Sequence, residues 1–233
     1  MRVIQDRGNK GSLKWIQRAI NDAPDYFDSR VRSQLPDVAR IEWLSPLADD
    51  GFAEYRDKSF LERIGHPELS AALSEFWPSR GPQWDALGRA DGGEILLVEA
   101  KAHIREMLSE GSKASEKSLD RISASLDATA AALRASPLIP WTGALYQTAN
   151  RIAHLKFLID HDVPARLLFV CFLDDNEMSG PTSIEEWQGA IELSRCLLGL
   201  PRQHLLNSRI SHVFMSTKEI GRDADQRPKI RFA

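Results

Sequence analysis

The sequence has few cysteines, no long apolar run and no excess of positive charge. Its two cysteines, Cys171 and Cys196, lack the paired spacing of a disulfide framework or a structural zinc site, which favours a reducing cytosol. No apolar run approaches the roughly 18 residues of a membrane helix, and residues 1–10 are polar, so we expect a cytoplasmic protein without membrane contact. The formal net charge of −3 is not that of a protein that coats nucleic acid non-specifically.

What the sequence does contain is enough apolar residues for one sizeable α/β core. The chain has 233 residues, of which 42% are hydrophobic. Apolar periodicity predicts helices over 12–21, 25–34, 52–64, 67–77, 119–135, 142–160 and 184–198, and strands over 83–90, 94–102, 165–173 and 210–216. The predicted fold class is α/β, with a mixed central sheet flanked by helices. Residues 1–45 are expected to form an N-terminal helical extension, and residues 46–233 the core domain.

Two neighbouring predicted strands carry charged residues inside or at the end of apolar runs. Asp85 follows Trp84 and precedes two apolar residues, while Glu99 and Lys101 end the run that starts at Ile95. Side chains alternate along a strand, so Glu99 and Lys101 share one face. Charges at the end of a buried strand need partners or a metal ion. Alone, an exposed Glu-x-Lys pair is usually only solvated, but this context favours a metal site.

The length of the loop between these strands decides whether Asp85 faces Glu99. If residues 91–93 form the loop, Asp85 lies directly opposite Glu99, with Cβ atoms roughly 5 Å apart. A two- or four-residue loop would pair Asp85 with Val98 or Ala100 and turn its side chain to the wrong face. The predicted metal site therefore depends on an odd loop length or on a bulge.

Asp85, the hairpin and the sequence Glu99-Ala100-Lys101 resemble the signature of the PD-(D/E)XK nuclease superfamily. Trp84 stands where the superfamily usually has proline. A helical region before the hairpin, and helix, strand and helix after it, are similar in order over roughly residues 47–175. The resemblance implies a restriction-endonuclease-like core. It also implies that Asp85, Glu99 and the carbonyl of Ala100 bind Mg²⁺ (or Mn²⁺), and that Lys101 orients the attacking water.

Members of this superfamily often add a glutamate from the first core helix to the metal site. The candidates here are Glu54, Glu62 and Glu75, and Glu54 is favoured because it lies beside Phe52 and Tyr55. A simple surface charge is the alternative interpretation of Glu54.

A stripe of polar residues follows the predicted helix 142–160. Gln147, Asn150, Arg151 and His154 recur at i, i+3, i+4 and i+7, and Tyr146 adjoins them. Amide, guanidinium and imidazole groups suit phosphate and base contacts. We therefore expect Tyr146, Gln147, Asn150 and Arg151 to face the site and bind nucleic acid. The alternative is a hydrogen-bonded contact between helices.

Together these patterns predict a Mg²⁺-dependent nuclease that acts on DNA. One alternative is a non-catalytic nuclease-like domain that binds a protein or nucleic-acid partner. Another is a metal-dependent hydrolase of small molecules. The intact set of aspartate, glutamate and lysine favours the enzyme over the binding domain.

Overall fold

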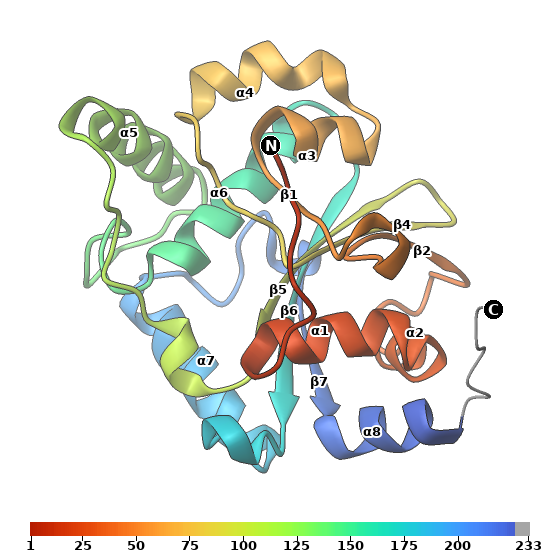
Figure 1. Ribbon diagram of the computed structural model, residues 1–233. Coiled ribbons are helices and arrows are strands. Elements are labelled where there is room, and N and C mark those ends of the chain that lie inside the picture. Colours follow the sequence, from red (N-terminus) through yellow and green to blue (C-terminus); the bar gives the residue numbers. More distant parts are fainter. Residues whose placement is uncertain (227–233) are drawn as a thin grey trace.

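The centre of the protein is a five-stranded mixed sheet, seen in a computed structural model that describes residues 1–226 (Figure 1). Its strands, in spatial order, are β2 (Ile41–Ser45), β4 (Ala86–Ala90), β5 (Ile95–Lys101), β6 (Ala165–Leu173) and β7 (Ile210–Ser216). Strands β2, β4 and β5 are antiparallel neighbours, whereas β5, β6 and β7 run parallel. The predicted α/β class with a mixed sheet is confirmed.

Helices cover both faces of this sheet (Figure 1). One face carries α3 (Asp57–Ile64), α4 (Ser70–Phe76), α5 (Glu116–Ala132), α6 (Tyr146–Asp160) and α7 (Ile184–Leu197). The other face carries α1 (Gly11–Asn21), α2 (Pro24–Arg32) and α8 (Thr217–Gln226). Ile95 and Leu97 of β5 pack into the first layer, whereas Leu96 and Val98 pack into the second. This two-sided burial explains why β5 is apolar at every position until Glu99.

The N-terminal residues belong to this core. Strand β2 lies within the predicted extension 1–45 and supplies one edge of the sheet, and α1 and α2 cover one of its faces. The short strand β1 (Arg2–Val3) pairs antiparallel with β3 (Glu54–Tyr55). Within residues 1–226, the predicted boundary between 45 and 46 therefore falls inside one packed unit.

The predicted helix over residues 52–64 is wrong at its start. Residues 54–55 form strand β3, and α3 begins only at Asp57. Strand β3 exists because it pairs with residues 2–3, a long-range contact that overrides local helix propensity. Other elements also start later than predicted, since α4 begins at Ser70, β4 at Ala86 and α6 at Tyr146.

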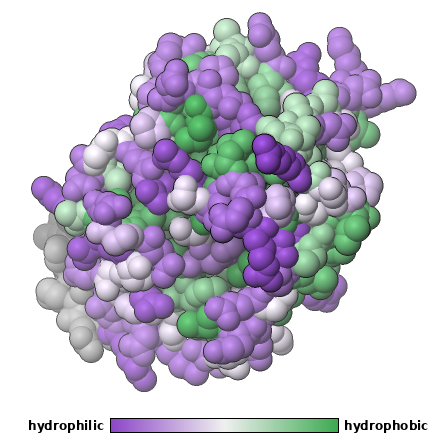
Figure 2. Space-filling model, turned by 180° about the vertical axis from the view of Figure 1, so that it is seen from behind, coloured by the Kyte–Doolittle hydropathy of each residue, from purple (hydrophilic) through white to green (hydrophobic). Residues whose placement is uncertain are grey.

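Within the described part of the chain, no helix combines the length and apolar content needed to cross a bilayer. Figure 2 shows hydrophilic residues over much of the rear face, with hydrophobic residues gathered in smaller separate patches. Both cysteines are free thiols, with Cys171 buried and Cys196 exposed. The predicted compartment remains a prediction.

Candidate active site

The β4–β5 hairpin has the register that brings Asp85 beside Glu99. Ala86 pairs with Val98, so one step further along the strands Asp85 reaches the level of Glu99. The loop consists of residues 91–93, the odd length that this register requires. The register prediction made from the loop is confirmed.

Asp85 is held against the backbone of β5. Its Oδ2 accepts a hydrogen bond of 2.7 Å from the N–H of Ala100. Within a strand, the N–H and C=O of one residue point to the same side, so the carbonyl of Ala100 also faces the Asp85 edge. Burial, followed by the charges of Glu99 and Glu54, raises the pKa of Asp85 well above its ordinary value. This environment favours a bound cation or a proton.

Glu99 is almost fully buried and is paired with two cations. Its Oε1 lies 2.5 Å from Lys101 Nζ, and its Oε2 lies 2.6 Å from Arg151 Nε. Burial would raise the pKa of Glu99, but Arg151 and Lys101 outweigh it and hold the pKa below its ordinary value. Burial lowers the pKa of Lys101, yet the charges of Glu99 and Asp85 raise it overall. Both partners are therefore ionised at neutral pH.

Helix α6 supplies polar side chains to the same place. Gln147 Oε1 accepts a hydrogen bond of 2.9 Å from Lys101 Nζ. Arg151 donates through Nη1 to Asn150 Oδ1 at 3.0 Å and through Nη2 to the carbonyl of Gln83 at 2.7 Å. Its guanidinium also lies over the ring of Trp84, 4.9 Å from the centroid. The guanidinium is thus fixed by protein contacts on every nitrogen.

The last residue of the predicted stripe belongs to the core instead. His154 is 2% exposed and packs against the rings of Phe76, Trp77 and Trp84. Its Nδ1 lies 2.8 Å from the carbonyl of Asn150. Burial lowers the pKa of His154 to about 3, so its imidazole is neutral. For this residue the alternative of a hydrogen-bonded packing contact is correct.

Glu54 reaches the site from strand β3 and not from a helix. It is 4% exposed, and its Oε2 accepts hydrogen bonds from Gln5 Nε2, at 3.0 Å, and from Gln83 Nε2. Burial is the main reason why its pKa is raised. The other two candidates, Glu62 and Glu75, are exposed on α3 and α4.

These residues line one cavity of about 660 Å³. Its acidic side chains are Glu54, Asp85, Glu99 and Glu106, and its basic side chains are Arg80, Lys101 and Arg151. All four residues expected to bind nucleic acid line the same cavity, namely Tyr146, Gln147, Asn150 and Arg151. The structure thus gathers every predicted site side chain in one place.

Several residues of this environment were not predicted, among them Gln83, Glu106 and Gln5. Gln83 lies two positions before Asp85, and strand alternation could have placed it on the same face. Glu106 accepts a 2.6 Å hydrogen bond from the N–H of Ala102, through a turn that gave no sequence signal. Gln5 arrives from the N-terminal segment, which residue patterns alone do not position.

The donor set is suited to a small divalent cation. No group of three or more His, Cys, Asp and Glu side chains in residues 1–226 is arranged to hold a metal ion on its own. A backbone carbonyl can complete such a set, because Mg²⁺ takes one or two carboxylates together with other oxygens. Asp85 Oδ1 accepts no hydrogen bond from the described residues, and the carbonyl of Ala100 faces the same edge. Asp85 Oδ1 and the carbonyl of Ala100 are therefore open to a cation, whereas both carboxylate oxygens of Glu99 already accept from Lys101 and Arg151.

No family model, no curated protein and no solved structure matches this chain. The functional argument therefore stands on the geometry of the cavity.

Proposed function

We propose that this chain is a Mg²⁺-dependent nuclease with a restriction-endonuclease-like core, which hydrolyses phosphodiester bonds in DNA. The observation that carries the proposal is the juxtaposition of Asp85, directly before β4, with Glu99 of the adjacent antiparallel strand β5, and with Lys101 in the same cavity. Two carboxylates beside one ammonium group are the set that metal-assisted attack of water on a phosphodiester requires.

The hairpin residues have distinct roles in this proposal. Asp85, Glu99 and the carbonyl of Ala100 would hold the Mg²⁺ or Mn²⁺ ion, which supplies charge neutralisation at the phosphate and lowers the pKa of water. Lys101 presents its ammonium group beside them, where it orients the attacking water and stabilises the charge that develops on the phosphate. Gln147 fixes the position of that ammonium group through its 2.9 Å hydrogen bond. Glu54 adds a third carboxylate to the cavity.

The walls of the cavity divide into positioning groups and contact groups. All the guanidinium nitrogens of Arg151 are engaged by Glu99, Asn150 and Gln83, so Arg151 positions Glu99. Tyr146 and Asn150 line the cavity as neutral donors and acceptors. Arg80 is exposed where it lines the cavity and makes no ion pair with the described residues, so it offers a cation for a substrate phosphate.

A plasmid-nicking assay tests this proposal. Wild-type protein should nick plasmid DNA with Mg²⁺ or Mn²⁺ and should stop when EDTA removes the cation. Asp85→Ala should lose this activity, because the remaining donors cannot hold the cation. Asp127→Ala is the matched control, since Asp127 is exposed on α5, far from the hairpin in sequence. Equal nicking by wild type and Asp85→Ala would contradict the proposal.

A second candidate is a non-catalytic nuclease-like domain that binds nucleic acid or a protein. One observation favours it: Glu99 is already paired with both Lys101 and Arg151 without a metal ion. Fluorescence anisotropy with labelled DNA separates the two candidates. DNA binding that is insensitive to Mn²⁺, together with no cleavage of any nucleic acid, would favour the binding domain.

A further inference from the structure

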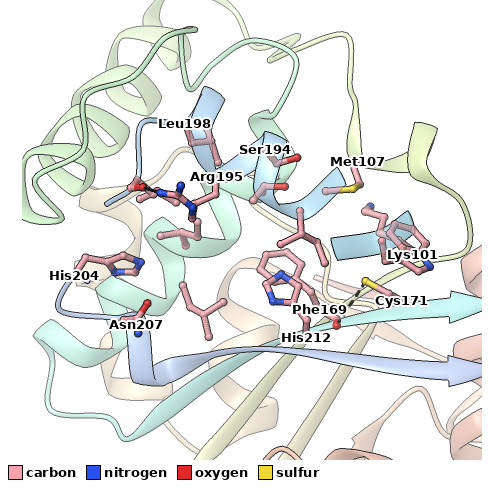
Figure 3. Close-up of a pocket in the computed structure, with 16 residues that line it drawn as sticks. Lys101, Met107, Phe169, Cys171, Ser194, Arg195, Leu198, His204, Asn207 and His212 are labelled. Carbon is pink, nitrogen blue, oxygen red and sulfur yellow. Dashed lines mark hydrogen bonds between the residues drawn. The ribbon is translucent and has the colours of Figure 1, made fainter. Parts of the chain in front are cut away.

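A second cavity, of about 230 Å³, lies on the other side of α6 (Figure 3). Its roof is formed by Ser194 of α7 and by Leu198 directly after that helix, and its floor is formed by Phe169 of β6 and His212 of β7. Lys101, Met107 and Cys171 lie at one end, whereas His204 and Asn207 lie at the other. The proposed nuclease chemistry uses no part of this cavity except Lys101.

The walls offer no free charge to a ligand. Lys101 is engaged by Glu99 and Gln147. Arg195 donates to Glu192 at 2.8 Å through Nε and Nη2, and its Nη1 donates to the carbonyl of Leu200. Burial raises the pKa of the Cys171 thiol to about 12, so it is uncharged. A charged ligand would enter this space without a counter-charge, which disfavours phosphates and carboxylates.

His212 is a polar group that faces the cavity and has no hydrogen-bond partner among the described residues. Its ring stacks on Phe169, with centroids 5.3 Å apart and planes 16° apart. Neither ring nitrogen is hydrogen-bonded within residues 1–226, and Figure 3 shows the imidazole directed into the cavity. Burial lowers the pKa of His212 to about 4, so at neutral pH the ring offers one donor and one acceptor.

The size of the cavity limits what it can hold. The cavity opens to solvent beside Asn207, which is exposed, so a small molecule can enter it. An apolar cavity of about 150 Å³ is known to bind benzene. At about 230 Å³, this cavity has room for a second fused ring.

We propose that the cavity between α6, α7 and strands β6 and β7 binds an uncharged, planar heteroaromatic molecule of two fused rings, which hydrogen-bonds to His212. The apolar roof and floor contact the ring faces, and the imidazole selects for a donor or acceptor at the ring edge. Asn207 lies at the mouth as a second polar contact. This inference goes beyond the proposed nuclease activity and does not rest on it.

Calorimetric titration with benzimidazole and with indene tests the proposal. The two molecules have nearly the same shape, but only benzimidazole carries ring nitrogens. At neutral pH we expect wild-type protein to bind benzimidazole about tenfold more tightly than indene, the value of one good hydrogen bond. Benzimidazole carrying a carboxylate should not bind. Failure of wild type to bind either neutral probe at millimolar concentration would overturn the proposal.

Two variants locate the binding to this cavity. Ser194→Leu should fill the space under α7 and abolish binding of both probes. His212→Phe keeps the stacking ring, so it should lower benzimidazole affinity to that of indene and leave indene binding unchanged. His161→Phe is the control, because the ring of His161 packs on that of Phe157 outside the cavity, with centroids 4.4 Å apart. An unchanged preference for benzimidazole in His212→Phe would overturn the proposal even if Ser194→Leu failed to fold.

Discussion

Helix α6 separates two cavities of opposite chemistry. Toward β3 and the hairpin, Gln147 and Arg151 face a cavity whose charged groups bind one another. Toward α7, Thr148 and Ile152 face a smaller, mostly apolar cavity. Gln147 and Thr148 are neighbours in sequence, as are Arg151 and Ile152. They face different cavities because one step along a helix turns the side chain by about 100°.

The difference shows how the two spaces are stabilised. In the charged cavity, ion pairs and hydrogen bonds compensate the loss of hydration, so removing one member leaves another without a partner. In the apolar cavity, Arg195 of the wall is paired with Glu192. The imidazole of His212 stacks on Phe169 but has no hydrogen-bond partner among the described residues. Substitutions of Arg151 or Asn150 in the first should therefore be costly, whereas substitutions that fill the second should be tolerated.

The largest expected effect is on catalysis in the charged cavity. Lys101→Ala should lower divalent-dependent DNA cleavage roughly 10²–10⁴-fold, because the group that acts on water and phosphate is lost. The fold and most of the Mn²⁺ affinity should remain. Lys156→Ala is the control, since Lys156 lies on α6 outside the cavity and its Nζ pairs with Asp160 Oδ1 at 2.8 Å. Plasmid nicking measures the cleavage rates of wild type and of both variants. Equal rates for wild type and Lys101→Ala would show that cleavage comes from another site or a contaminant.

The next effect is on stability. Arg151→Met should destabilise the fold by about 3–5 kcal/mol, because it leaves Glu99 buried with Lys101 as its remaining cation. Urea unfolding of Lys58→Met is the comparison, since Lys58 makes only an exposed pair with Glu62 at 3.4 Å. A loss below about 1 kcal/mol for Arg151→Met, the value of an exposed pair, would show that the charged cavity is not held together by this network.

A pH effect should arise from the apolar cavity. Burial lowers the pKa of His212 from 6.5 to about 4, so the folded protein binds fewer protons than the unfolded chain between these values. Above pH 6.5 this titration has no effect on the free energy of unfolding. Between pH 6.5 and about 4, the free energy of unfolding falls by up to about 1.4 kcal/mol for each pH unit. His212→Phe should remove that slope. Urea unfolding of wild type and His212→Phe between these pH values measures how the stability of each protein depends on pH. The same dependence in both proteins would contradict the prediction.

The smallest effects should have opposite signs on the two sides of α6. Ser194→Leu fills apolar space and should stabilise the protein by about 0.5–2 kcal/mol. Asn150→Leu removes the acceptor of Arg151 Nη1 and should destabilise it by about 1–3 kcal/mol. Thermal unfolding of the two variants tests the contrast directly. Changes of the same sign would mean that the two cavities do not differ in this way.

The charged cavity was largely predictable because its centre is local in sequence. The Asp-Gly-Gly turn at 91–93 sets the register, and alternation then places Asp85, Glu99 and Lys101 together. Helical spacing likewise grouped Gln147 with Arg151. These rules act over a few residues, which is why the sequence pattern was sufficient.

The remaining features depend on contacts between distant segments. Strand β3 and Glu54 are placed by pairing with residues 2–3, and Gln5 comes with them. The N-terminal segment joins the core because the apolar faces of α1 and α2 match one side of the sheet, which no local pattern specifies. The apolar cavity was missed for the same reason, since its walls come from several separate elements and consist of ordinary core residues.

The most direct measurement of the central claim is a calorimetric titration of Mn²⁺ into wild-type protein and Asp85→Ala. Wild type should bind the ion through Asp85, Glu99 and the carbonyl of Ala100, and Asp85→Ala should not bind it. Asp85→Ala should also be at least as stable as wild type in metal-free buffer, because one of several close carboxylates is gone. Wild-type protein that binds no Mn²⁺, or equal binding by both proteins, would contradict the assignment of a metal site to the hairpin.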